Sequence, residues 1–118
     1  MARKEDCIFC KLANGEIPTT VVYEDDDVCA FEDSSPMMPV HTLIVPKEHY
    51  DSLQDDVPQE LLGKLLAAVP KVAAAKGVDE SGYRILANTG DDAQQFVKHL
   101  HIHVLGGAPM NSGDPSAK

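Results

Sequence analysis

Histidine alternates with aliphatic residues in the segment His99-Leu100-His101-Ile102-His103, which continues as Val104-Leu105-Gly106-Gly107. This period of two is that of a β-strand, whose successive side chains point to opposite faces of a sheet. The pattern predicts that Leu100, Ile102 and Val104 enter a core, while the histidines line the other face roughly 6–7 Å apart. Each imidazole brings two ring nitrogens that need partners, so core filling does not explain the row. We interpret it as a strand that carries chemistry; the alternatives are an exposed histidine-rich strand or an incidental metal-binding ladder.

Short runs of β-branched and apolar residues predict four more strands. These runs lie at residues 19–24, 28–32, 42–45 and 82–88. The acidic triplet at residues 25–27 separates the first two runs, and we interpret it as the solvated turn of a hairpin. Pro36 and Pro39 predict a loop before the third strand.

Two segments have the hydrophobic period of a helix. Residues 7–14 predict a short helix that ends at Gly15, and residues 58–76 predict a long helix between Pro58 and Gly77. Pro70 lies inside the long helix and predicts a kink, because proline lacks a backbone donor. The face expected to lie on the sheet contains Leu61, Leu62, Leu65, Leu66, Val69 and Val72. Alanines at positions 67, 68 and 73–75 are small enough to allow close approach of a second subunit.

The order of these elements predicts an α+β fold with a mostly antiparallel sheet of about five strands, one long helix and one short helix. The length is that of a single domain, which we expect to occupy residues 1–118. Its core would span residues 7–107. The Pro-, Gly- and Ser-containing residues 108–118 predict a flexible tail.

The chain carries 19 acidic and 10 basic residues, which gives a formal net charge of -9. This charge argues against a nucleic acid polymer as a partner, because such binding relies on basic surfaces. The net charge does not exclude a small phosphorylated ligand, which local histidines and backbone N–H groups can hold. We find no apolar run long enough for a membrane span, and the polar first six residues are unlike a secretory signal. We therefore expect a cytoplasmic protein without a membrane partner.

Cys7 and Cys10 are separated by two residues, which is a common half-site for zinc. A redox pair and two ordinary buried cysteines are the alternatives. Two histidines would complete a Cys2His2 site, and the spacing alone does not choose among His41, His49 and the three of the histidine row. The odd cysteine, Cys29, is interpreted as a small buried hydrophobe.

The histidine row, read as His99-x-His101-x-His103-Val104-Leu105, resembles the signature of the histidine triad (HIT) superfamily of nucleotide hydrolases and transferases. Further segments match in family order: Cys7-Ile-Phe-Cys-Lys11, Gly15-Glu-Ile-Pro18, Tyr23-Glu-Asp-Asp26, Ala30-Phe31, Pro39-Val-His-Thr-Leu-Ile-Val-Pro-Lys47, Asn88-x-Gly90 and Leu105-Gly-Gly107. The resemblance covers roughly residues 7–110. It is strongest to the bacterial branch similar to histidine triad nucleotide-binding proteins, and it implies a homodimer.

The resemblance implies that His101 is a nucleophile that attacks the α-phosphorus of a purine nucleotide and forms a transient nucleotidyl-imidazole. A neutral imidazole is a suitable nucleophile near pH 7. His103 would contact the phosphate and help to protonate the leaving group. His99 would complete the catalytic triad by holding the strand in place, and His41 would support the site.

The resemblance also implies the nucleotide-binding and metal-binding residues. His103, Asn88 and Gln95 match phosphate contacts, Asp33 matches the ribose acceptor, and Phe9 and Phe31 match base-pocket walls, although plain core packing also explains the two aromatics. One structural zinc ion per chain would be held by Cys7, Cys10, His49 and His99. That ion would have no open coordination position, and no organic cofactor is expected.

Three positions depart from the family pattern. Gln94 replaces a common glycine, Phe96 replaces a small hydroxyl or acidic residue, and Ser34 replaces an aliphatic residue of the base pocket. The tail after Met110 lacks the aromatic-proline ending of the animal relatives.

The expected activity is hydrolysis of a purine nucleoside phosphoramidate. The alternatives are dinucleoside polyphosphate hydrolysis, a nucleotide-binding adaptor with negligible turnover, and a metal buffer.

Overall fold

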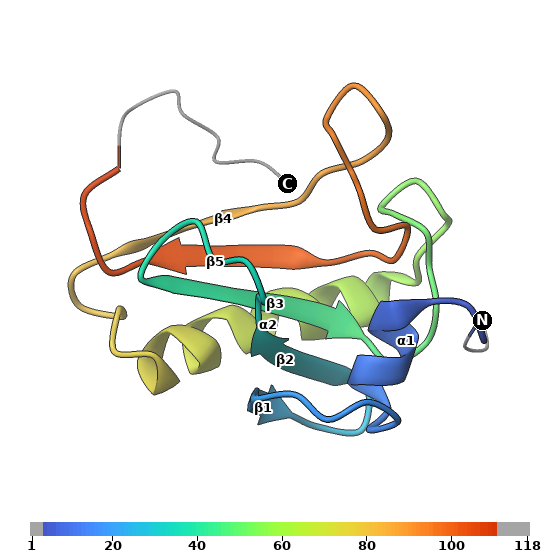
Figure 1. The fold of residues 1–118 in the computed structure, drawn as a ribbon, viewed down its shortest axis with the longest axis horizontal. Coiled ribbons are helices and arrows are strands. Elements are labelled where there is room, and N and C mark those ends of the chain that lie inside the picture. Colours follow the sequence, from blue (N-terminus) through green and yellow to red (C-terminus); the bar gives the residue numbers. More distant parts are fainter. Residues whose placement is uncertain (1–3, 111–118) are drawn as a thin grey trace.

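The computed structural model describes residues 4–110 and places two helices and five strands in them (Figure 1). In chain order these elements are α1 (Ile8–Ala13), β1 (Val21–Glu24), β2 (Val28–Glu32), β3 (Val40–Pro46), α2 (Gln59–Ala75), β4 (Tyr83–Leu86) and β5 (Ile102–Gly106). The strands form one antiparallel sheet in the order β1-β2-β3-β5-β4. The predicted α+β fold is therefore confirmed. Residues 108–110 have no regular structure, and the rest of the predicted tail lies outside the described residues.

The sheet separates two hydrophobic cores, because neighbouring residues of a strand face opposite ways. On β2, Val28 and Ala30 join the core beneath α2, whereas Cys29 and Phe31 join the core beneath α1. Figure 1 shows α2 lying across one face of the sheet and α1 on the other. No helix among residues 4–110 is long and apolar enough to cross a membrane.

The long helix packs through a narrower face than the sequence predicts. Leu65, Val69 and Val72 are buried against the sheet, but Leu66 is 55% exposed. Leu66 is turned about 100° from Leu65 on a helix of 3.6 residues per turn, so it points away from the sheet. The helix continues through Pro70, which is exposed.

The predicted hairpin turn between β1 and β2 has a specific capping residue. One carboxylate oxygen of Asp25 accepts hydrogen bonds from the backbone N–H groups of Asp27 and Val28, each at 2.9 Å. The Tyr23 hydroxyl donates to the other carboxylate oxygen at 2.8 Å. This pattern is an Asx-type turn, in which a side chain replaces a backbone acceptor.

The histidine strand begins later than predicted. β5 starts at Ile102, and His99 lies in a bend because the N–H of Leu100 donates to the Tyr50 carbonyl, at 2.6 Å, outside the sheet. The predicted alternation of faces is kept, since Leu100, Ile102 and Val104 all enter the core beneath α2. In the ladder with β3, His103 stands opposite Leu43, on the side of the sheet that α1 covers.

Candidate functional site

A cavity of about 490 Å³ opens on the α1 side of the sheet. His101 and His103 line it from the end of the histidine segment. Phe9, Phe31 and Asp33, which the resemblance assigns to nucleotide binding, line it as well. The complete lining is Ile8, Phe9, Leu12, Pro18, Thr19, Phe31, Glu32, Asp33, Ser34, Ser35, Leu43, Val97, His101 and His103. Its mostly apolar wall with a few convergent polar groups is typical of a small-molecule site.

Hydrogen bonding sets the tautomer of His101. Its Nδ1 lies 2.6 Å from the carbonyl oxygen of His99, and a carbonyl only accepts, so Nδ1 carries the proton. Burial lowers the pKa of His101 below its ordinary value of 6.5, although the His99 carbonyl and the charge of Asp33 oppose this. The ring is therefore neutral near pH 7, with its lone pair on Nε2. The ring of Phe9 packs edge-on against it, with 5.0 Å between centroids.

His103 takes the opposite tautomer. The backbone N–H of Met37 donates to Nδ1 of His41 at 3.0 Å, so a neutral His41 carries its proton on Nε2. That nitrogen lies 2.9 Å from Nδ1 of His103 and 3.4 Å from a carboxylate oxygen of Asp33. When His103 accepts this proton at Nδ1, its own proton sits on Nε2. Two residues that line the cavity thus carry a lone pair on Nε2 of His101 and a buried N–H on Nε2 of His103, with 4.9 Å between the ring centroids.

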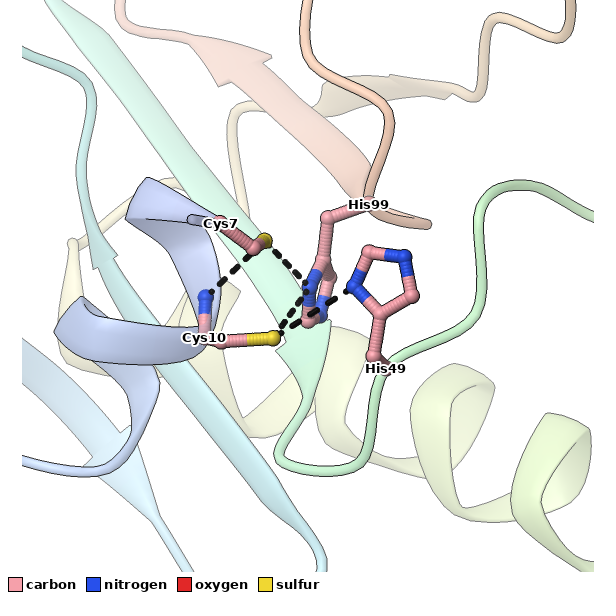
Figure 2. A group of neighbouring side chains, drawn as sticks. All are labelled: Cys7, Cys10, His49 and His99. Carbon is pink, nitrogen blue, oxygen red and sulfur yellow. Dashed lines mark hydrogen bonds between the residues drawn. The ribbon is translucent and has the colours of Figure 1, made fainter. Parts of the chain in front are cut away.

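A second cluster joins α1, the turn after β3 and the start of the histidine segment. Figure 2 shows Cys7, Cys10, His49 and His99 converging from these elements. Nδ1 of His99 lies 3.2 Å from Sγ of Cys7 and 3.4 Å from Sγ of Cys10, and Nδ1 of His49 lies 3.4 Å from Sγ of Cys10. All four ligand atoms are within 4.8 Å of one another.

The two histidines of this cluster are oriented as metal ligands. Nε2–H of His99 donates to the Pro46 carbonyl at 2.8 Å, and Nε2–H of His49 donates to the Asp51 carboxylate at 2.5 Å. Both rings therefore present the Nδ1 lone pair to the sulfur atoms, which is the outer-shell arrangement seen around ligating histidines. Burial lowers the pKa of His99 to about 4, which keeps the ring neutral. The cluster can hold a metal ion, and its donor set is that of tetrahedral zinc sites.

Asp33, His41 and His103 also bring three potential ligand atoms together. Here the hydrogen bonding disfavours a metal. Nδ1 of His41 already accepts the Met37 N–H, so a neutral ring carries a proton on Nε2, the nitrogen that faces the other two residues. Nε2–H of His41 instead donates to Nδ1 of His103 at 2.9 Å, with the Asp33 carboxylate 3.4 Å from the same nitrogen.

The structure does not bring every predicted nucleotide ligand to the cavity. Asn88 and Gln95 are not among the lining residues, and the Gln95 amide bonds to Gly90 and Val97 of its own loop and to the Asp51 carbonyl in the turn after β3. Of the three positions that depart from the family pattern, Ser34 lines the cavity, whereas Phe96 is 73% exposed and does not fill it. Gln94 has φ +59°, which explains why glycine suits that position.

Asp51 was missed by the sequence analysis. Its carboxylate orients His49, and its backbone carbonyl accepts from Gln95. A carboxylate two residues after a candidate ligand was the available signal, because ligating histidines usually donate their second N–H to such a group.

Comparison with known proteins identifies the family. The HIT domain model matches residues 14–110. The chain is 47% identical to Protein HitA of Neisseria gonorrhoeae over 104 residues, which cover 86% of this chain and 96% of that protein. The chain belongs to the HIT family.

Two solved structures agree. A HIT family hydrolase from Legionella pneumophila Philadelphia 1 superimposes with a TM-score of 0.87 at 44% identity, covering 92% of this chain and 98% of that one. A histidine triad nucleotide-binding protein from Candida albicans gives 0.79 at 34% identity, covering 92% and 84%.

Proposed function

We propose that this protein hydrolyses purine nucleoside monophosphate derivatives at the α-phosphorus, with a phosphoramidate as the leading substrate class. The observation that carries the proposal is the pair of opposite tautomers in one cavity. His101 offers an Nε2 lone pair, and His103 offers an Nε2–H donor. A nucleophile and an acid are the two groups that displacement of an amine from phosphorus requires. The hydrolase and nucleotide-binding relatives support the same class of reaction.

The reaction divides into two displacements. Nε2 of His101 attacks phosphorus and forms a nitrogen–phosphorus bond, while the bond from phosphorus to the substrate's amine breaks and the amine takes a proton that His103 supplies. Water then attacks phosphorus and the nitrogen–phosphorus bond to His101 breaks, while Nε2 of His103 takes a proton from the water. The nucleoside monophosphate is released, and both histidines return to their starting states. The imidazole becomes positively charged in the intermediate, so the Nδ1–H bond to the His99 carbonyl strengthens when it is needed.

The remaining cavity residues supply substrate binding in this proposal. Phe9 and Phe31, which pack edge-on with 5.5 Å between centroids, form an apolar wall for the base. Asp33 accepts from a ribose hydroxyl, and His103 contacts the phosphate. Asn88 remains a predicted phosphate contact, although it is not among the residues that line the cavity.

We further propose one structural zinc ion per chain, held by Cys7, Cys10, His49 and His99. Four protein ligands leave no open position, so the ion's contribution is to hold the chain in place rather than to activate water. His99 links the proposed zinc site to the nucleophile, because its backbone carbonyl orients His101. Cys7, Cys10 and Cys29 form no disulfide, which fits the reducing cytoplasm expected for this protein.

Intact mass spectrometry after brief mixing with adenosine 5′-phosphoramidate tests the proposal. Wild type should gain the mass of one adenylyl group, and His101→Ala should show no adduct and less than a few per cent of the turnover. Nucleotide binding and the circular dichroism spectrum should be nearly unchanged, since the substitution removes only the nucleophile. Exposed Lys98→Ala is the matched control. Tight nucleotide binding without any adduct in wild type would indicate an adaptor and overturn the proposal.

A further inference from the structure

Gln95 is a buried polar residue whose hydrogen bonds point away from the cavity. It is 5% exposed, while the neighbouring Gln94 is exposed. Its amide nitrogen donates to the carbonyls of Asp51, at 2.6 Å, and Val97, at 3.0 Å. Its amide oxygen accepts from the N–H of Gly90 at 3.0 Å. The partners fix the orientation of the amide, because carbonyls only accept and a backbone N–H only donates.

These bonds close one loop and fasten it to another segment. Gly90 and Val97 lie on either side of Gln95 in the connection between β4 and β5, and the N–H of Gln95 also donates to the Gly90 carbonyl at 3.0 Å. Asp51 belongs to the turn after β3, more than 40 residues away along the chain. The same Asp51 orients His49 through its carboxylate.

The amide has no donor left for a nucleotide. A glutamine side chain carries two N–H donors, and both are taken by carbonyl groups. The oxygens of a phosphate diester or phosphoramidate accept hydrogen bonds, so Gln95 could bind one only by breaking a buried bond. Loss of such a bond is unfavourable when the partner is left without a replacement.

We propose that Gln95 is a positioning residue, which braces the loop of residues 90–97 against Asp51 and so holds Val97 and the histidine segment at the cavity. The expected effect of Gln95 on catalysis rests on the proposed function, whereas its effect on the order of the loop rests on the hydrogen bonds alone. In this proposal Gln95 keeps the loop ordered and does not bind the substrate.

The test compares Gln95→Leu and Gln95→Glu with Gln94→Ala in the zinc-loaded protein. Glutamate keeps an acceptor for Gly90 but loses both donors and turns a carboxylate toward two carbonyls. It should therefore disturb the loop at least as much as leucine does, although it is nearly the same size as glutamine. Hydrogen exchange of the Gly90 and Gln95 amides, measured by NMR, should accelerate about tenfold or more in both variants. Gln94→Ala should leave these rates unchanged.

Kinetics on adenosine 5′-phosphoramidate separate positioning from contact. A brace acts on the placement of reacting groups, so kcat should fall about ten- to a hundredfold while KM changes less than threefold. Unchanged amide exchange, or a rise in KM at constant kcat, would overturn the proposal, and the latter would restore Gln95 to the nucleotide site.

Asp51→Ala provides an independent comparison. It removes the carboxylate that orients His49 but keeps the backbone carbonyl to which Gln95 donates. Zinc affinity should fall about 10–100-fold, measured by chelator competition, with the loop amides still protected at saturating zinc. Loss of protection in this variant would show that the brace runs through the metal site instead of Gln95 and would contradict the assignment. The exchange measurements need no turnover, so failure of the proposed function would be recognised separately.

Discussion

At the scale of single residues, the chemistry depends on which nitrogen of each histidine holds the proton. The sequence predicts that His99, His101 and His103 share a face, and the structure keeps that arrangement. The contact that sets the His101 tautomer is local, since the His99 carbonyl lies two residues away. The tautomers of His99 and His103 cannot be predicted from the sequence, because the groups that decide them come from distant segments: the Pro46 carbonyl for His99 and the Met37 N–H, through His41, for His103. These contacts exist only after the sheet has formed. The hydrogen bond from the Gln95 amide to the Asp51 carbonyl could not be predicted for the same reason.

Gln94 provides a test at this scale. Its φ of +59° is left-handed, a conformation that a residue with a Cβ adopts at a cost. Gln94→Gly should raise the free energy of unfolding by up to about 1 kcal/mol, with greater backbone freedom of the unfolded chain offsetting part of the gain. Urea denaturation measures the change. Ala93→Gly, at a neighbouring position without positive φ, should lower stability, and a loss of stability in Gln94→Gly would show that the local strain argument is wrong.

At the scale of elements, sequence patterns located both helices and all five strands, but not their ends. β3 extends to Val40 because Val40 pairs with Gly106, and β5 starts late because Leu100 bonds outside the sheet. Ends are decided by partners, which a local pattern does not contain. The metal cluster joins three of these segments, namely the start of α1, the turn after β3 and the approach to β5.

Removing a candidate metal ligand should loosen that junction. Cys7→Ser should lower both melting temperature and turnover, because a structural metal contributes directly to folding free energy. It should slow the reaction less than His101→Ala, since the nucleophile remains, and cadmium should substitute for zinc with little loss. Metal content, melting temperature and rate are measured together for wild type, Cys7→Ser and Cys29→Ser, the last a cysteine outside the cluster. Wild-type protein that is fully active without bound metal would show that zinc is not part of this site.

At the scale of the whole molecule, we propose that the α2 side of the sheet is also the side on which two subunits meet. Ile85 stands opposite Val104 in the ladder, so it lies on the face that α2 covers, yet it is 40% exposed at the edge strand β4. Tyr83 and Leu66 are exposed as well. The alanines support this less than the sequence suggested, because Ala68 and Ala73 are buried within the subunit.

Sedimentation equilibrium tests this homodimer. Wild type should be dimeric at micromolar concentration, and Ile85→Lys should shift it toward monomer, since a charge would be buried at an edge strand. Leu53→Lys, which changes a similarly exposed residue in the turn after β3, should not. A wild type that sediments only as monomer at this concentration would exclude the arrangement.

The strict alternation of residues 100–104 also restricts how the gene for this protein can change in length. One codon inserted after His101 would turn every following side chain to the opposite face, placing an imidazole in the core and an isoleucine at the cavity. The connection of residues 87–89, which precedes the braced loop, has no such alternation of faces. A single-residue insertion scan, read out by folded yield, should therefore tolerate extra residues in that connection and reject them across residues 100–105. If single-residue insertions are tolerated equally in both stretches, the alternation of faces does not limit the length of the histidine segment.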